Sequence, residues 1–321
     1  MASSFYGDSR LALTPGVAAV VAVAALCLLS SGCATTSDAT AQAERVARIA
    51  IDANGAPVVH ASVDGQDALL VIDSGASYHL IDAGFARRLK LYTIDVNSAV
   101  DAGGRKFPLS ISESTKVRLG AWQVVHDGVG VADMPPDARR GGLTGILSPQ
   151  WIDSGHGTIV LDLPALELRW MTDDVARQRF TGRTTTPVER CEGLYSVRLG
   201  VRALVDGVRT LLEVDTGRPI STFDPARPLG RRLAADADGT VAELMGLGGP
   251  IHGRLVKPTA IGIGDARVSV RPMLVERPQL AAVDECGYEG VIGSDVLRHC
   301  VLVFAHGHAS LVCTTPPAVS P

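Results

Sequence analysis

The clearest pattern along the chain is a polar turn followed by an apolar run, and it occurs twice. Residues 63–75 read VDGQDALLVIDSG and residues 205–217 read VDGVRTLLEVDTG, so the windows align without a gap at an offset of 142. Seven of the thirteen positions are identical. An Asp-Gly pair between two β-rich runs is typical of a hairpin. We therefore predict two equivalent hairpins, each ending in an Asp-Ser-Gly or Asp-Thr-Gly loop.

The segments that follow each hairpin also come in the same order. Each half continues with a Gly-rich tip, further strands, a short apolar run that begins at Gly145 or Gly290, and a closing hairpin. A short helix is expected before each closing hairpin, near Trp151 and over residues 294–298. Self-similarity at this scale indicates two copies of one structural unit.

The repeat predicts an all-β protein made of two similar β-barrel lobes related by internal duplication. We place the first lobe at residues 46–171 and the second at residues 187–317. Residues 172–186 are polar and show no strand alternation, so we interpret them as the linker. With 321 residues, 46% of them hydrophobic and 20% charged, the chain can bury the core that two lobes need.

The beginning of the chain has the pattern of a targeting segment. Arg10 precedes the apolar run 17–29, and small residues then lead to Cys33, which predicts a signal peptide over residues 1–32. The Leu-Ser-Ser-Gly-Cys ending resembles the lipobox of bacterial lipoproteins, which implies that Cys33 is acylated. Residues 33–45 are polar and low in complexity, as expected of a tether. We expect an exported, membrane-anchored lipoprotein in the periplasm or outer membrane, with a soluble secreted form or an uncleaved anchor as alternatives.

Cysteine usage agrees with export. Beyond the targeting segment the chain holds Cys191, Cys286, Cys300 and Cys313. An even number of cysteines in an exported chain predicts disulfides. If residues 300–313 form a hairpin that turns at His306 and Gly307, Cys300 faces Cys313 across adjacent strands. Cys191 then pairs with Cys286 by elimination.

Charge and histidine content exclude some partners. The formal net charge is −4, from 34 acidic and 30 basic side chains without a block of like charge, so a nucleic-acid partner is not expected. The cysteine spacings match no zinc pattern, and His306 and His308 are interpreted as part of a polar turn. We expect neither a metal nor a cofactor.

Two motifs connect the repeat to chemistry. Asp73-Ser-Gly and Asp215-Thr-Gly, each at the end of an apolar strand, resemble the active-site loops of aspartic proteases. In that family each loop is followed, after a flap hairpin, by two apolar residues and Gly, and the runs 145–148 and 290–293 stand in the corresponding places. Because the flap regions hold no Tyr, the chain resembles retropepsin-like bacterial aspartyl proteases more than pepsin. The resemblance covers nearly the whole chain after the tether.

The resemblance implies that Asp73 and Asp215 form the catalytic pair. Two carboxylates within hydrogen-bond reach cannot both ionise cheaply, so the pair holds one proton. One member can then activate water while the other protonates the scissile carbonyl. The resemblance also assigns supporting roles to Ser74, Thr216, Gly75 and Gly217. The two hydroxyls would exchange hydrogen bonds across the lobe interface, and the two glycines would let backbone N–H groups approach the carboxylates.

Two residues depart from the family pattern. Ser148 stands where the family prefers Gly, and Arg218 stands where the first lobe has Ala76. A cation at this place would favour ionisation of both carboxylates and could remove the shared proton. Alternatively, the guanidinium points outward, to an acid such as Glu213 or Asp224 or to an acidic substrate group.

A third copy of the Asp-Ser/Thr-Gly motif begins at Asp153 but follows no long apolar run, so we interpret it as a turn. The sequence as a whole predicts a monomeric aspartic endopeptidase that acts on peptides, with flaps near residues 102–108 and 246–253. One rival hypothesis is a non-catalytic peptide-binding module disabled by Arg218. The other is an active site built between two chains.

Overall fold

The computed structural model describes residues 44–317, except for 102–103, 113–114, 126–127, 153–154, 156, 193–196 and 277–285. These residues all belong to the unit that runs from Asp38 to Pro321. The predicted signal peptide and Cys33 lie outside the described residues, as do Asp153 and Ser154 of the third Asp-Ser/Thr-Gly motif.

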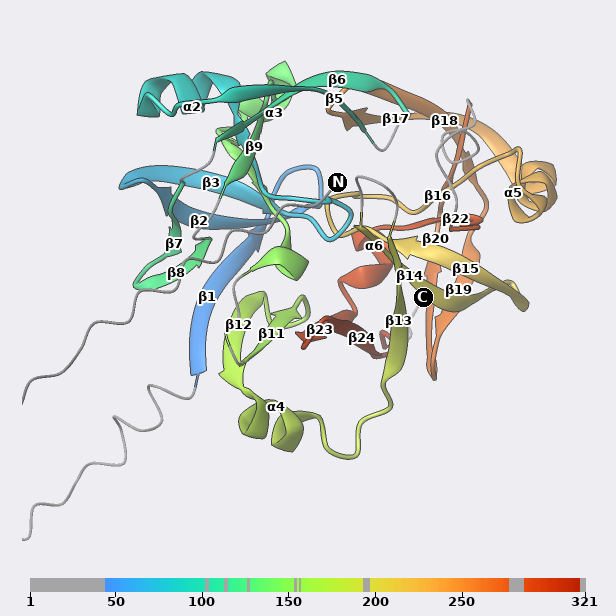
Figure 1. Cartoon of the computed structure of the whole chain (residues 1–321). Coiled ribbons are helices and arrows are strands. Elements are labelled where there is room, and N and C mark those ends of the chain that lie inside the picture. The colour runs from blue at the N-terminus through green and yellow to red at the C-terminus, as the bar shows by residue number, and fades with distance from the viewer. Residues whose placement is uncertain are drawn as a thin grey trace, which may run out of the picture. The chain divides into compact units, whose positions relative to one another are not determined.

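The first half of the chain is made of short strands with a few short helices (Figure 1). Its elements are β1 (Glu44–Ile51), β2 (Pro57–Val63), β3 (Gln66–Ile72), β4 (Leu80–Asp82), α2 (Ala83–Leu89), β5 (Ile94–Val100), β6 (Lys106–Ser112), β7 (Val117–Leu119), β8 (Trp122–Val125), β9 (Val129–Ala132), α3 (Pro136–Arg140), β10 (Gly145–Leu147), η1 (Pro149–Trp151), β11 (Gly157–Asp162), β12 (Glu167–Thr172) and α4 (Asp173–Phe180).

The second half follows the same order of strands. Its elements are β13 (Thr186–Glu192), β14 (Val197–Val205), β15 (Val208–Val214), β16 (Thr222–Phe223), α5 (Pro228–Leu233), η2 (Ala234–Asp236), β17 (Ala237–Gly246), β18 (Gly249–Val256), β19 (Thr259–Ile263), β20 (Ala266–Val270), β21 (Met273–Val275), β22 (Gly290–Ile292), α6 (Ser294–Leu297), β23 (Cys300–Ala305) and β24 (His308–Cys313).

The two hairpins predicted from the repeat are β2–β3 and β14–β15. Their turns place Asp64 and Gly65 at φ 47° and 83°, and Asp206 and Gly207 at φ 45° and 81°. Positive φ at both central residues defines a type I′ turn, whose twist matches that of the flanking strands. The Asp-Gly pairs are therefore local determinants of the hairpins. The last three residues of β3 and of β15 are buried.

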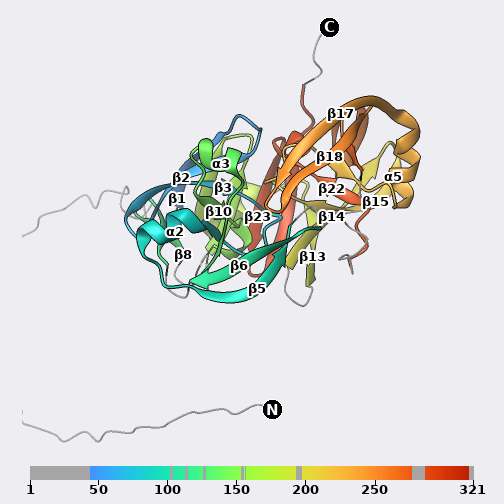
Figure 2. The same ribbon diagram turned by 90° about the horizontal axis from the view of Figure 1, so that it is seen from above.

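Each hairpin is embedded in the same pairing pattern. In the first lobe, β3 pairs in parallel with β10, which pairs with β4, and β4 pairs in parallel with β9. In the second lobe, β15, β22, β16 and β21 repeat these pairings with the same directions. In Figure 2, β3 and β10 lie on the left, and β15 and β22 lie on the right. The protein is mostly β, with equivalent topology in its two halves.

A sheet that runs through both lobes holds them together. Its strand order is β1, β12, β11, β23, β24 and β13, all antiparallel. The central pair, β11 with β23, contains one strand from each lobe. Backbone hydrogen bonds thus cross between lobes at the middle of this sheet.

The element boundaries refine two of the sequence predictions. Strand β1 begins at Glu44, which pairs with Met171, so the last residues of the predicted tether are part of the sheet. The predicted linker contains α4, which follows β12 directly. The last residue of the predicted linker, Thr186, begins β13. Among the described residues, no helix is long and apolar enough to cross a membrane.

Candidate active site

The two Asp-containing loops begin where β3 and β15 end. The Asp73 backbone N–H donates to the carbonyl of Leu147 over 3.0 Å, and that of Asp215 donates to the carbonyl of Ile292 over 3.1 Å. The acceptors are the last residues of β10 and β22, the parallel neighbours of β3 and β15. Each loop is therefore held by the second strand of its own repeat.

Ser74 and Thr216 connect the two loops through reciprocal hydrogen bonds. The Ser74 N–H donates to Thr216 Oγ1 over 3.0 Å, and the Thr216 N–H donates to Ser74 Oγ over 3.1 Å. Each hydroxyl also donates across the interface, Ser74 to the carbonyl of Val214 and Thr216 to that of Ile72. Both side chains are completely buried. The loops are thus fixed to each other by four buried hydrogen bonds.

The glycine of each loop faces the carboxyl group of the other loop. A Cβ at Gly75 would lie 2.7 Å from Asp215 Cγ, and a Cβ at Gly217 would lie 2.5 Å from Asp73 Cγ. Any side chain at either position would therefore displace a carboxyl group. The Gly75 N–H also donates to Asp73 Oδ1 over 2.7 Å. The glycines permit the approach of the two loops that places both carboxyls together.

The pKa of Asp73 lies well above its ordinary value. Burial is the largest cause, followed by the negative charge of Asp215 and a side-chain hydrogen bond with it. Hydrogen bonds from the backbone N–H groups of Gly75 and Ala76 act in the opposite direction and do not prevail. The two carboxyl groups are therefore close enough to share a proton.

Arg218 lies against this pair. Its Nε donates to Asp215 Oδ2 over 3.3 Å, and its Nη1 donates to Thr222 Oγ1 over 2.6 Å. The Arg218 side chain is buried, with 5% of its surface exposed. The guanidinium therefore lies inside the protein against Asp215, and its charge also opposes the rise in the pKa of Glu213, one of the two acids named as partners from the sequence. The cation faces the pair through Asp215.

The equivalent place in the first lobe is apolar. Ala76 corresponds to Arg218, and Leu80 corresponds to Thr222, at the offset of 142 that relates the two loops. Ala76 packs against a cluster that contains Leu80 and Ile146. The second lobe therefore replaces an apolar contact with a buried polar pair, and Thr222 supplies a hydrogen-bond acceptor that the guanidinium needs when it is removed from water.

Ser148 and His79 form a connection that sequence reasoning did not find. The Ser148 N–H donates to His79 Nδ1 over 3.2 Å, and His79 Nε2 donates to the carbonyl of Trp151 over 3.1 Å. Burial lowers the pKa of His79 to about 4, so the imidazole is neutral near pH 7. Ser148 Oγ also donates to the carbonyl of Ala76 over 2.8 Å. Ser148 thus holds the first loop in place through its hydrogen bond to Ala76.

The second lobe makes the same connection with smaller residues. Ser221 stands 142 positions after His79, and its Oγ accepts from the Gly293 N–H over 3.1 Å. A Cβ at Gly293 would come within 2.5 Å of the carbonyl oxygen of Arg218. Glycine is therefore required here but not at Ser148. The offset of 142 shows that His79 and Ser221 are equivalent positions. It does not show that each accepts a hydrogen bond from the backbone N–H at the end of the next repeat segment, Ser148 or Gly293.

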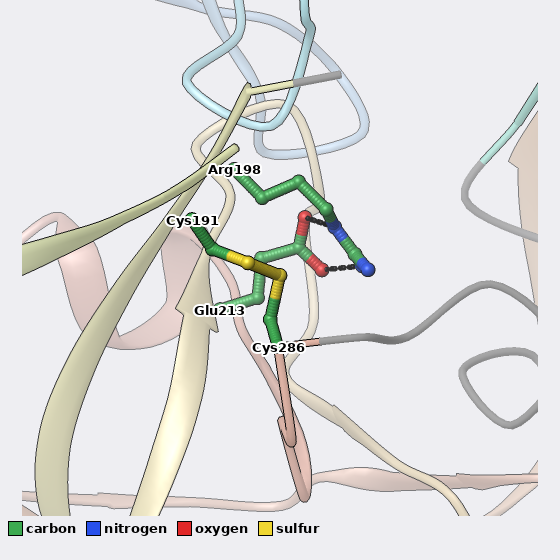
Figure 3. Close-up of a disulfide and its surroundings, with 4 residues drawn as sticks. All are labelled: Cys191, Arg198, Glu213 and Cys286. Atoms are coloured by element: carbon green, nitrogen blue, oxygen red, sulfur yellow. Dashed lines mark hydrogen bonds and ion pairs between the residues drawn. A yellow bond between two sulfur atoms is a disulfide. The ribbon is translucent and has the colours of Figure 1, made fainter. Parts of the chain in front are cut away.

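The strand that leads to Asp215 carries a buried ion pair, and a disulfide lies beside that pair. Glu213, two residues before Asp215 on β15, accepts from Arg198 through both carboxylate oxygens, and Figure 3 shows this pair beside the disulfide of Cys191 and Cys286. Burial raises the pKa of Glu213, and the charge of Arg198 opposes that rise. The second disulfide joins Cys300 to Cys313 on β23 and β24. These are the two pairs that the sequence predicted.

The fold and the paired loops define an aspartic protease architecture, and comparison with known proteins supports it. Residues 59–148 match the sequence model of the family described as aspartyl protease. The crystal structure of the aspartic proteinase from Irpex lacteus superposes with a TM-score of 0.52 and 15% sequence identity, covering 85% of this chain and 98% of that one. A comparison with curated protein sequences finds no match.

The predicted fold is thereby confirmed, and the first lobe resembles the aspartyl protease family in sequence. The family match lies within the first lobe and includes Asp73, Ser148 and the flap between them. The structural match extends over both lobes. Together they support a protease function.

Proposed function

We propose that the protein is an aspartic endopeptidase in which Asp73 and Asp215 activate water for hydrolysis of a peptide bond. The observation that carries this proposal is the meeting of two carboxyl groups from different lobes, each against the glycine of the opposite loop. Two carboxyls placed together away from water are costly to the fold, because their negative charges repel each other when both are ionised. Such a cost is typical of a catalytic site.

The surroundings divide the two roles. The raised pKa of Asp73 favours its protonated form, whereas Asp215 is the carboxyl that accepts a hydrogen bond from the Arg218 guanidinium. Within the described residues, Asp215 Oδ1 is buried without a hydrogen-bond donor. A proton on the Asp73 carboxyl would supply the donor that Asp215 Oδ1 needs. We therefore assign the proton to Asp73 in the free enzyme.

Hydrolysis then needs no covalent intermediate. Asp215 accepts a proton from water as the water oxygen bonds to the scissile carbonyl carbon, and Asp73 donates its proton to the carbonyl oxygen. When the C–N bond breaks, the leaving nitrogen takes the proton from Asp215, and one hydroxyl of the intermediate returns its proton to Asp73 as the carbonyl re-forms. Arg218 donates to Asp215, so its positive charge lies beside the member of the pair that accepts the proton from water.

We also propose that the enzyme is exported and anchored through an acylated Cys33. The two disulfides of the lobes support export, because such bonds persist in oxidising compartments. The substrates would then be peptides or proteins that reach the same membrane surface.

The dyad is tested by replacing each carboxyl. Asp73→Asn and Asp215→Asn should each lower the rate of peptide cleavage by at least about a hundredfold, since each removes one partner of the proton transfer. A raised pKa in the folded state means that Asp73 contributes stability fully below its unfolded pKa and loses it as pH rises through the folded pKa. Asp73→Asn should therefore gain stability relative to the wild type as pH rises toward neutrality, which thermal unfolding across pH measures.

Asp153→Asn is the matched control, since it alters the remaining Asp-Ser/Thr-Gly motif, Asp153-Ser-Gly. It should leave cleavage and the pH dependence of stability unchanged. Cleavage by Asp73→Asn or Asp215→Asn at the wild-type rate would reject the assignment.

A peptide-binding module without catalysis is the second candidate, and the contact between Arg218 and Asp215 favours it. A cation held this close could keep both carboxyls ionised. Binding of peptides by the wild type without cleavage at any pH between about 3 and 7 would select this candidate.

A further inference from the structure

The tips of the two hairpins predicted as flaps contact each other. One hairpin is formed by β5 and β6 in the first lobe, the other by β17 and β18 in the second. The Gly248 N–H donates to Asp101 Oδ2 over 2.7 Å, and Arg105 Nη1 donates to the carbonyl of Gly248 over 3.3 Å. Both backbone groups of Gly248 are thus bound by side chains from the other lobe.

The first hairpin is organised for this contact. The Arg105 N–H donates to Asp101 Oδ1 over 2.9 Å, and the Asp101 N–H donates to the carbonyl of Arg105 over 2.9 Å. These bonds leave Asp101 Oδ2 directed at Gly248. A Cβ at Gly248 would lie 2.6 Å from Arg105 Cβ, so only glycine permits the approach.

Leu247, beside Gly248, crosses into the first lobe. It packs against an apolar cluster made of Leu80, Phe107, Leu109, Ala132, Met134 and Ile146. All of these residues belong to the first lobe, and we call them the first-lobe cluster. Ala76 packs against the same cluster, and its N–H donates to Asp73 Oδ1 over 3.1 Å. The cluster that receives Leu247 therefore adjoins the loop of the proposed catalytic Asp73.

We propose that Leu247 is an internal competitor of the substrate. In the free protein it occupies apolar surface of the first-lobe cluster that a large apolar side chain of a peptide takes when bound. The contacts of Asp101 and Arg105 with Gly248 hold it there. This inference rests on the proposed function for the location of the cleft, but it concerns binding and not the chemistry of cleavage.

The competition follows from the placement of Leu247. A peptide side chain can reach the cluster only in molecules whose second hairpin has withdrawn, so the apparent affinity is reduced by the fraction of molecules in that state. The penalty applies to apolar side chains that need the cluster and not to small polar ones. Leu247 therefore acts as a determinant of specificity. A peptide binds well only if its own side chain makes more apolar contact with the cluster than Leu247 loses when it is displaced.

The test measures binding of short peptides in which the central amide is reduced to CH2–NH, so that they cannot be hydrolysed. One peptide carries Phe on both sides of this bond, and the other carries Ser. Leu247→Ala should bind the Phe peptide about tenfold more tightly than the wild type, which is about 1.4 kcal/mol, with little change for the Ser peptide. Leu247→Met, which keeps the apolar volume, should bind both peptides as the wild type does.

Amide hydrogen exchange of the free protein supplies a second readout. The Gly248 N–H should be protected in the wild type and in Leu247→Met, and should exchange faster in Leu247→Ala and in Asp101→Ala. Unchanged or weaker binding of the Phe peptide by Leu247→Ala would overturn the proposal, and so would unchanged protection of Gly248. Because neither readout requires cleavage, the proposal can hold even if the protein proves to be catalytically inactive.

Discussion

Positions 76 and 218 occupy the same place in the two active-site loops but differ in charge. Ala76 belongs to an apolar environment with Leu80, whereas Arg218 binds Asp215 and Thr222. The hydroxyl of Thr222 makes the buried cation tolerable, since it accepts a hydrogen bond from Nη1. The second loop thus carries Arg218 together with the hydroxyl that satisfies it. We expect the positive charge of Arg218 to act electrostatically on the carboxyl pair.

Removal of this pair should move the pH dependence of activity. Arg218→Ala removes a positive charge beside Asp215, so the carboxyl pair should hold its shared proton to higher pH and the optimum of kcat/KM should shift upward. The single variant leaves Thr222 without its donor and should lose about 1–3 kcal/mol of stability. Arg218→Ala with Thr222→Leu reproduces the Ala76 and Leu80 pair of the first lobe and should recover part of that loss. An unchanged pH profile in both variants would show that the cation does not act on the dyad.

Among the elements, β15 is the strand whose end is surrounded by an ion pair, a disulfide and a paired strand. It carries Glu213 and ends at Val214, directly before Asp215, and it pairs with β22. The segment that precedes β22 is joined to β13 by the disulfide of Cys191 and Cys286. Tyr288 in that segment is buried against Gly200 of β14, and the Arg198 guanidinium lies 5.2 Å from its ring centre. The disulfide therefore anchors the residues that surround the ion pair of Glu213.

The two disulfides should differ in their effect. Replacement of Cys191 and Cys286 by Ala opens a loop with a sequence separation of 95, against 13 for Cys300 and Cys313. The chain-entropy relation gives the longer bridge an advantage of about 1.8 kcal/mol in the free energy of unfolding. The first replacement should also lower activity by loosening Tyr288 and Arg198, and the second should not. Denaturant unfolding and cleavage assays of both variants measure this, and equal losses of stability and activity would contradict it.

At the scale of the whole molecule, the site depends on both lobes being present. The loops are joined by the bonds of Ser74 and Thr216, and β11 pairs with β23 in the sheet that runs through both halves. A single lobe would expose β11 or β23 as an unpaired edge and would hold one carboxyl without its partner.

Separated lobes should therefore fail to cleave peptides. Chains covering residues 44–180 and 183–317 should each be inactive, whereas the intact chain should be active as a monomer with a specific activity independent of concentration. Sedimentation and activity measured over the same concentration range test this. Activity that rises with the fraction of dimer would favour a site built between two chains.

Much of the fold was predictable because its signals are local. The Asp-Gly turns, the apolar runs before each Asp, and the repeat at an offset of 142 depend on residues adjacent in sequence. The pairing of Cys300 with Cys313 followed from the register of one hairpin. The boundaries of the tether and linker were less accurate, since pairing of Glu44 with Met171 and the start of α4 depend on the packed lobes.

The sequence by itself determined the two lobes, the two Asp loops and the unusual cation at position 218. Only the tertiary structure decided which way Arg218 points, that His79 accepts from Ser148, and that Leu247 packs in the opposite lobe. The physical reason is that a side chain's direction depends on the partners that satisfy it. Those partners come from different strands or from the other lobe, and no local pattern records which of them will be close.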